Sequence, residues 1–390
     1  MVRIVLRILL LLPGIAACLP LAAYAAGRTF TDRFHIAQFM YWAPGLWLLG
    51  GGTALTVVFL VAHALSRASR RGVPERWASR VLVVALLAGW GHYGLAEAHV
   101  HRALARSRTI VGAERPQTTG ETLRVVQWNA TSPDVVPRPT LLLPLLARFD
   151  PDVLLATAAM APHQYAAVIQ DLPRNLHATR SGGLVVVSKR PILDATTHPL
   201  GLADPVSAAF VQPRPGALPP APDELRANWE TLYNSYGPEL GLQRRQFRNA
   251  DPGFLTIIRL APRAEGQAPL VLWHVDLPSD PLRSKWQLAR TVAGRIAELT
   301  RGTPLLIIGD FNIPRGSASL RRAFGAVESA FDQIGWGIEP TWPRRSPVLQ
   351  IDQALLPRPL QASGWGTFDP GVSDHRAIIV DLNLSGPGVP

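Results

Sequence analysis

The segment Leu305-Leu306-Ile307-Ile308-Gly309-Asp310-Phe311-Asn312 places two polar side chains directly after a short apolar run. An aliphatic run bounded by glycine and aspartate is typical of a buried β-strand. The end of a strand holds side chains rigidly while still exposing them to a ligand. The segment therefore predicts a strand with a candidate site at its carboxyl end, although Asp and Asn in this position are also common in simple turns.

Three further segments have polar residues just beyond an apolar run. They are Val126-Gln127-Trp128-Asn129, Gln350-Ile351-Asp352 and Ser373-Asp374-His375. Carboxylate and amide oxygens that converge on one rim suit a hard divalent cation such as Mg²⁺, and a histidine beside them can polarise an attacking water. Each segment alone also has a structural explanation, since Ser-Asp-His is equally typical of a helix N-cap or a loop.

Other apolar runs with β-branched residues lie on both sides of these segments and predict the strands of a sheet core. Helical spacing occurs between some of them, most clearly over Trp286 to Leu299. The pattern predicts a mixed α/β sandwich, interrupted by a Pro-rich insertion at about 202–252 that lacks a strand pattern. The predicted strands are Leu123 to Gln127, Val153 to Leu155, Gly183 to Val187, Phe254 to Leu260, Leu270 to His274, Leu305 to Ile308 and Ala377 to Leu382.

The order of these motifs resembles the endonuclease/exonuclease/phosphatase superfamily over about residues 122–384. The matching features are Trp-Asn at 128–129, Ser-Lys-Arg-Pro-Ile at 188–192, His274 at a strand end, Gly-Asp-Phe-Asn at 309–312, Pro-Thr-Trp at 340–342, Ile-Asp at 351–352 and Ser-Asp-His at 373–375. The resemblance implies a four-layered, DNase I-like α/β sandwich over residues 122–385. It also implies cleavage of phosphate esters with Mg²⁺ or Mn²⁺ as the cofactor.

The resemblance further implies catalytic roles for five residues. Asp310 would position or activate the attacking water, and Asn312 would hydrogen-bond the scissile phosphate. His375 would act as the general base or stabilise the transition state, with Asp352 orienting its ring and raising its basicity. His274 would contact the phosphate or protonate the leaving group; its alternative is a polar residue that merely closes a strand.

The metal ligands that the resemblance implies are Asn129, Asp374 and Asp310, but the principal ligand of the family is missing. The strand equivalent to 151–155 normally continues into Gln-Glu, and Ala158 stands where that Glu belongs. Loss of a central oxygen ligand weakens the Lewis-acid role of a metal. Three alternatives stay open: the remaining oxygens bind the metal, a distant residue such as His163 or one from the insertion replaces the Glu, or the domain binds a phosphorylated ligand or partner without hydrolysis.

The first hundred residues contain three apolar runs, at 4–26, 42–65 and 81–100. Each is close to the roughly 20 residues that a helix needs to cross a bilayer core. These runs predict an all-α transmembrane region over 1–100, joined by a polar linker at 101–121 to the C-terminal domain. The first run has two further interpretations, as a signal peptide cleaved near Ala26 or as a segment modified at Cys18, the only cysteine.

The positive charge of the chain is concentrated around these runs. Residues 1–110 hold twelve Arg and three acidic residues, which account for most of the formal net charge of +11. The Arg-rich loop at 66–80 is expected in the cytoplasm, which places the C-terminal domain outside in a multi-pass membrane protein. The near-neutral domain argues against tight binding of duplex DNA, so the expected substrate remains open between nucleic acid, a lipid headgroup and a small phosphoester.

Overall fold

The computed structural model describes residues 2–67, 74–103, 110, 113–114, 120–130, 142–157, 165–166, 169–170, 172–202, 253–262, 264–300 and 302–385. Ala158, His163 and nearly all of the predicted insertion lie outside these residues. The chain divides into two compact units. One contains Met1–Ala105 with Ser284–Trp286 and Gly316–Ala318, and the other contains the remainder.

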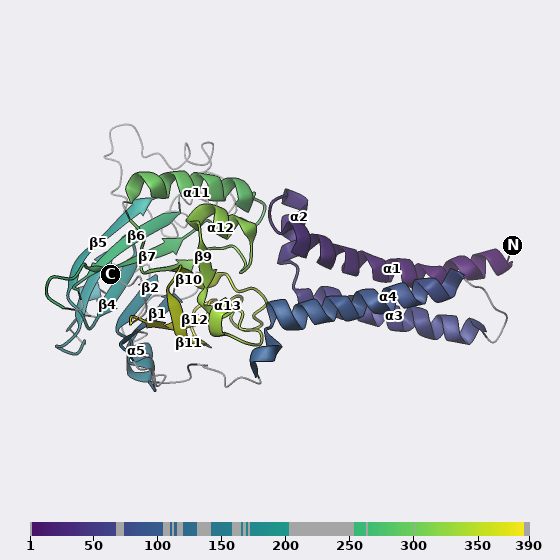
Figure 1. The fold of residues 1–390 in the computed structure, drawn as a ribbon, viewed down its shortest axis with the longest axis horizontal. Coiled ribbons are helices and arrows are strands. Elements are labelled where there is room, and N and C mark those ends of the chain that lie inside the picture. Colours follow the sequence, from purple (N-terminus) through teal and green to yellow (C-terminus); the bar gives the residue numbers. More distant parts are fainter. Residues whose placement is uncertain are drawn as a thin grey trace, which may run out of the picture. The chain divides into compact units, whose positions relative to one another are not determined.

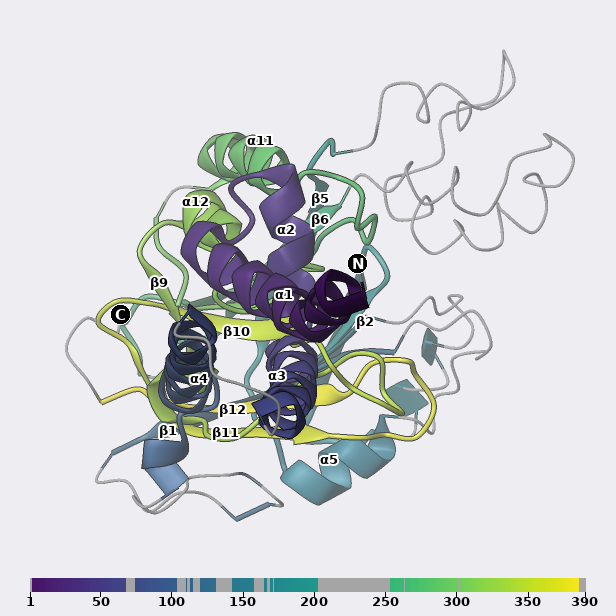
Figure 2. The same ribbon diagram turned by 90° about the vertical axis from the view of Figure 1, so that its right-hand side faces the viewer.

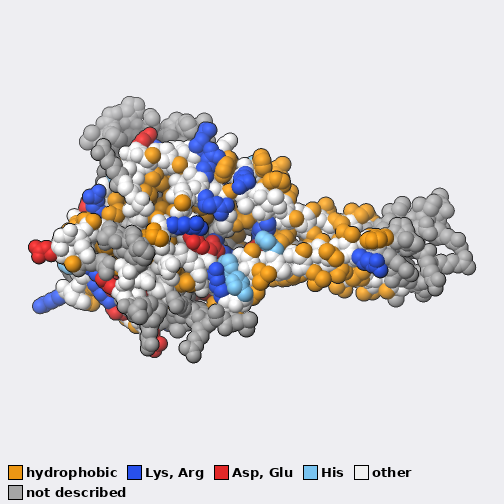
Figure 3. All heavy atoms as spheres, viewed as in Figure 1, with side chains coloured by type: hydrophobic (Ala, Val, Ile, Leu, Met, Phe, Trp, Pro, Cys, Tyr) orange, Lys and Arg blue, Asp and Glu red, His pale blue; other side chains and the backbone are white. Residues whose placement is uncertain are grey.

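The first unit consists of helices that cover the three predicted apolar runs. Figures 1 and 2 show the three long helices side by side, and Figure 3 shows hydrophobic side chains along their surface. Among the described residues, one segment, Gly45–Ala64, is long and apolar enough to cross a bilayer, with a mean hydropathy of 1.9 over 20 residues. All three crossings stay predictions. The elements are α1 (Val2–Phe30), α2 (His35–Trp42), α3 (Gly45–Arg67), α4 (Pro74–His92), a π-helical turn η1 (Tyr93–Glu97) and a 3₁₀ turn η2 (Val100–Ala103).

A polar network joins α1 to η1 within the first unit. The Nε atom of Arg28 lies 2.7 Å from Oε1 of Glu97, and the Tyr24 hydroxyl donates to the same carboxylate at 2.6 Å. The Tyr24 hydroxyl also lies 2.9 Å from Nδ1 of His92. These contacts give the ionisable residues at this end of α4 a structural role, because each has a partner inside the helical unit.

Over its described residues, the second unit is built on two six-stranded sheets. The strand order of the first sheet is β11 (Gln361–Phe368), β12 (Ala377–Asn383), β1 (Thr122–Asn129), β2 (Val153–Thr157), β4 (Leu184–Ser188) and β3 (His177–Ser181). The order of the second is β5 (Ile192–Pro199), β6 (Phe254–Leu260), β7 (Leu270–Asp276), β8 (Leu306–Asp310), β10 (Asp352–Pro357) and β9 (Val327–Ser329). Most neighbouring strands are antiparallel, while β1–β2 and β7–β8 are parallel pairs.

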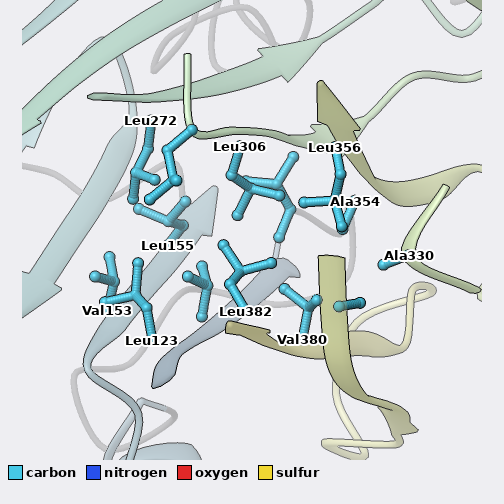
Figure 4. Close-up of a cluster of buried hydrophobic side chains, with 14 of the residues drawn as sticks. Leu123, Val153, Leu155, Leu272, Leu306, Ala330, Ala354, Leu356, Val380 and Leu382 are labelled. Carbon is cyan, nitrogen blue, oxygen red and sulfur yellow. The ribbon is translucent and has the colours of Figure 1, made fainter. Parts of the chain in front are cut away.

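The main hydrophobic core lies between the two sheets. Figure 4 shows Leu155 and Val153 of β2 facing Leu272 of β7 and Leu306 of β8 across this space. Because side chains alternate across a strand, the odd-numbered residues of β1 and β2 point into this core. Their even-numbered neighbours, such as Leu154, pack in a second cluster on the outer face.

Helices cover the outer faces and complete the predicted four-layered α/β sandwich. Buried residues of α11 (Lys285–Leu299) and α12 (Ala318–Phe324) share a cluster with the second sheet. The short helix α5 (Leu143–Phe149) packs against the first sheet, and α13 (Ala330–Ile334) leads into the loop before β10. The layers are visible in Figure 1.

Candidate active site

The polar strand ends converge at one end of the space between the sheets. Figure 4 shows the apolar layer between the sheets. At the end of this layer, pairs of polar side chains join the first sheet to the second. Three such pairs lie at neighbouring positions. They are Thr157–His274, with 3.3 Å between Oγ1 and Nε2, Asn129–Asp310, with 2.9 Å between Nδ2 and Oδ2, and His375–Asp352, with 2.8 Å between Nδ1 and Oδ2.

Strand alternation explains why these side chains meet. Leu123 and Val125 of β1 lie in the core between the sheets, so Asn129 at the end of the strand faces the same way. Leu306 and Ile308 of β8 set the direction of Asp310 in the same manner. The sequence thus ends each inward-facing aliphatic row with polar residues, Gln127 and Asn129 in β1 and Asp310 in β8, and the last polar residue of each row lies at the rim.

His375 is the centre of the charged cluster. Its Nδ1 is bonded to Asp352, while its Nε2 lies 3.7 Å from Oδ2 of Asp310 and 3.9 Å from Oδ1 of Asp374. Burial by itself lowers the pKa of the imidazole, but the charges of Asp352, Asp310 and Asp374 and the hydrogen bond to Asp352 outweigh it and raise the pKa to about 10. The ring is therefore cationic at neutral pH in the arrangement seen here.

Asp310 is held on several sides. Its Oδ1 accepts the backbone N–H of Asn312 at 2.9 Å, and its Oδ2 accepts the side-chain amide of Asn129. Burial and the nearby charge of Asp352 raise the pKa of Asp310 to about 6, although His375 and the two hydrogen bonds oppose the rise. A carboxylate with a pKa close to neutral can both accept and release a proton.

Two predicted site residues lie at the edge of this cluster. Asn312 follows Asp310 with a left-handed φ of 48°, and its side-chain amide donates to the Leu277 carbonyl at 2.7 Å. The Asp374 side chain is 49% exposed and accepts the indole N–H of Trp342 at 3.3 Å. Asn312 is thus tied to the chain after β7, whereas Asp374 is accessible to a ligand from solvent.

Other residues support the site without having been predicted as part of it. The Ser373 hydroxyl donates to the Asn129 carbonyl at 2.6 Å and accepts the N–H of His375, so it joins β1 to the Ser-Asp-His segment. The Thr341 hydroxyl accepts the N–H of Asp352 at 3.1 Å. Both lie inside motifs that the sequence displays. Thr157 had no such signal, because a threonine at a strand end is ordinary.

The residues present fit a divalent cation. Asp310, Asp352 and His375 bring potential ligand atoms within 4.8 Å of one another, and Asp374 adds a third carboxylate beside the single imidazole. Negative charge therefore exceeds positive charge, and hard cations such as Mg²⁺ prefer oxygen ligands. Since Nδ1 of His375 is already bonded to Asp352, the side of the cluster that suits a cation is that of Asp310 and Asp374.

Comparison with known proteins identifies the family. The sequence profile of the endonuclease/exonuclease/phosphatase family matches residues 121–375. The chain belongs to this family. A search among curated proteins finds no match.

Several solved structures are similar to this chain at low identity. A humanized TDP2 of D. rerio is 15% identical, with a TM-score of 0.45, and the match covers 67% of this chain and 99% of that one. A mannosyl-6-phosphatase of Bacteroides thetaiotaomicron is 14% identical, with a TM-score of 0.46, over 67% and 99% of the two chains. A family protein from the same organism is 14% identical, with a TM-score of 0.46, over 68% and 95%.

Proposed function

We propose that this chain is a membrane-anchored, divalent-metal-dependent phosphoesterase that acts outside the cytoplasm. The observation that carries the proposal is His375, buried and held between Asp352 and Asp310 beside a solvent-accessible carboxylate, Asp374. An imidazole with this many acidic neighbours is protonated, and its positive charge stabilises negative charge on a bound substrate. A phosphate ester that undergoes attack by water develops such charge on its phosphoryl oxygens.

The protein groups divide the reaction between them. Asp310, with its pKa of about 6, is ionised at neutral pH and takes a proton from the attacking water. Asp352 keeps a proton on Nδ1 of His375, so the Nε2–H is the group that faces the phosphoryl oxygens. His274, on the neighbouring strand β7, contacts the phosphate or gives a proton to the oxygen of the departing alcohol.

A divalent cation, when bound, supplies Lewis-acid stabilisation of the phosphate. Asp310 and Asp374 would hold it with Asn129, whose amide already bonds Asp310. The family glutamate is absent from the sequence because Ala158 takes its place. We therefore expect weak metal affinity, with the dissociation constant raised relative to a variant that restores the carboxylate.

The membrane part of the proposal rests on the helices of the first unit. Gly45–Ala64 suits a bilayer crossing by length and composition. The positive charge of the Arg-rich segment after α3 favours a cytoplasmic position for that segment. Cys18 is the sole cysteine, so single cysteines introduced into a Cys18→Ser chain test the orientation. Labelling of a cysteine at Ser385 in intact cells by an impermeant maleimide supports the proposal, and labelling only after lysis contradicts it.

Hydrolysis by the purified full-length chain tests the activity. The substrates are bis-p-nitrophenyl phosphate, plasmid DNA and vesicles that contain phospholipid or sphingolipid, each with Mg²⁺ or Mn²⁺ and with EDTA. We expect metal-dependent turnover that is abolished in Asp310→Ala. Absence of turnover on every substrate contradicts the proposal that the chain is an enzyme. The substrate that is cleaved identifies the substrate class. The proposed membrane anchor favours a lipid or envelope phosphoester as that class.

The alternative function is a domain that binds a phosphorylated ligand without hydrolysis, and Ala158 is the observation that favours it. An Ala158→Glu variant distinguishes the two. A silent wild type that becomes active in Ala158→Glu indicates an intact site that lacks its metal ligand. Activity in the wild type that Asp310→Ala removes indicates a working enzyme.

A further inference from the structure

The Thr157 hydroxyl contacts His274 across the two sheets. Its Oγ1 lies 3.3 Å from Nε2 of the ring, and the two residues are only 2% and 1% exposed. Thr157 is the last residue of β2, directly before the position where Ala158 replaces the family glutamate. This contact therefore lies on the side of the site that has lost its usual carboxylate.

The His274 side chain needs a hydrogen-bond partner because it extends from an apolar part of the strand. Leu270 and Leu272, on the same face of β7, belong to the hydrophobic core, so the ring extends from an apolar wall. A buried polar group without a hydrogen bond is costly, and a neutral imidazole has two tautomers that its hydrogen bonds select. A hydroxyl both donates and accepts, and it can hold the ring without adding a charge.

The two histidines of the site thus have chemically different partners. His375 is bonded to the carboxylate of Asp352, which favours its cationic form. His274 is bonded to the hydroxyl of Thr157, which fixes orientation but contributes no charge.

We propose that Thr157 is a positioning residue for His274, whose Nε2 it holds so that one tautomer and one ring orientation are presented to the substrate. The inference rests on the proposed phosphoesterase function, in which His274 contacts the phosphate or the leaving group. Thr157 itself is buried beneath the site and acts only through the ring.

Two substitutions in the full-length chain separate positioning from packing. Thr157→Val keeps the shape of the side chain and removes the hydroxyl, whereas Thr157→Ser keeps the hydroxyl and removes a methyl group. With bis-p-nitrophenyl phosphate, we expect Thr157→Val to lower kcat about threefold to tenfold, the range for loss of one neutral hydrogen bond. The KM should stay within about twofold, and Thr157→Ser should restore kcat.

Nitrogen chemical shifts of ¹⁵N-labelled histidine give a readout that does not depend on turnover. The His274 signals are assigned from their loss in His274→Gln. We expect Thr157→Val to change the Nε2 and Nδ1 shifts of His274 and Thr157→Ser to return them. Thermal melting verifies folding, and Thr157→Ala replaces the Val variant if that variant unfolds.

Unchanged nitrogen shifts and unchanged kcat in folded Thr157→Val would overturn the inference, as would a Ser variant that fails to restore either. If the wild type hydrolyses no substrate, the proposed function fails. The nitrogen shifts then still decide whether the hydroxyl fixes the ring, so the two failures are distinguishable.

Discussion

Two clusters of buried charge lie on opposite faces of the first sheet, and they differ in how their charges are balanced. On the outer face, Arg124 and Asp381 form a bidentate pair with distances of 2.7 and 2.8 Å. On the inner face, one imidazole, His375, is surrounded by three carboxylates. The first cluster has one charge of each sign, and the second has a surplus of negative charge.

The difference shows what each cluster contributes. The Arg124 guanidinium also donates to the Phe149 carbonyl at 3.0 Å, so it joins β1, β12 and the end of α5. Such a pair is strongly destabilising to break, since the remaining partner is left as an unpaired buried charge. At the site, the unequal charges appear instead as displaced pKa values, about 10 for His375 and about 6 for Asp310. Groups displaced in this way are typical of functional sites.

The largest expected effect comes from His375→Gln. We expect kcat to fall by about 10²- to 10⁴-fold, the usual range for loss of a positioned acid or base. The melting temperature should fall as well, because the buried carboxylates of Asp352 and Asp310 lose the cation that balances them, so kcat is compared per folded molecule. Hydrolysis and thermal melting of the purified variant measure the two effects. A variant that retains more than a tenth of wild-type turnover would contradict the assigned role.

Arg124→Met is expected to lower stability without lowering turnover. Breaking a buried ion pair on one side costs about 3–5 kcal/mol of folding stability, while the site on the other face of the sheet keeps its residues. Denaturant titration should therefore show a large loss of stability, with kcat per folded molecule unchanged. Arg124→Lys is the matched control. It keeps the charge but loses the bidentate geometry, so its loss should be smaller.

The strands that sequence reasoning missed have more than one physical reason. Four of them, β3, β5, β9 and β11, are the edges of the two sheets. An edge strand such as β5, with the sequence Ile-Leu-Asp-Ala-Thr-Thr-His-Pro, is largely accessible to solvent and so carries no continuous apolar run. The inner strand β10 was recognised only as the Ile-Asp motif at its start. The central strands other than β10 were predictable because burial on both faces leaves an aliphatic signature.

The site was predictable where it belongs to motifs and not where it depends on packing. Asp310, Asp352 and His375 were named from short segments, and the structure brings them together. Thr157 reaches His274 only because β2 and β7 face each other across the sandwich, which no local pattern encodes. The importance of Ala158 came from the family pattern, and that residue lies outside the part of the chain that the structure describes.

The smallest expected effect tests a third kind of buried charge, the lone carboxylate of Glu339. Its Oε2 accepts no hydrogen bond from a described residue. Burial raises its pKa from the ordinary 4.5 to about 7, and the Trp365 indole opposes the rise only in part. A raised native pKa means that the native state favours the protonated form, so its contribution to stability is complete below pH 4.5 and is lost as the pH rises through 7.

Glu339→Gln should therefore stabilise the chain by about 1–3 kcal/mol at pH 8, a value reduced for partial exposure, and by progressively less toward pH 4.5. Melting curves of the variant and the wild type across this range measure the difference, with a Gln substitution of the exposed Glu265 as the matched control. A pH-independent difference would contradict the raised pKa, because it would mean that Glu339 has the same pKa in the native and the unfolded chain.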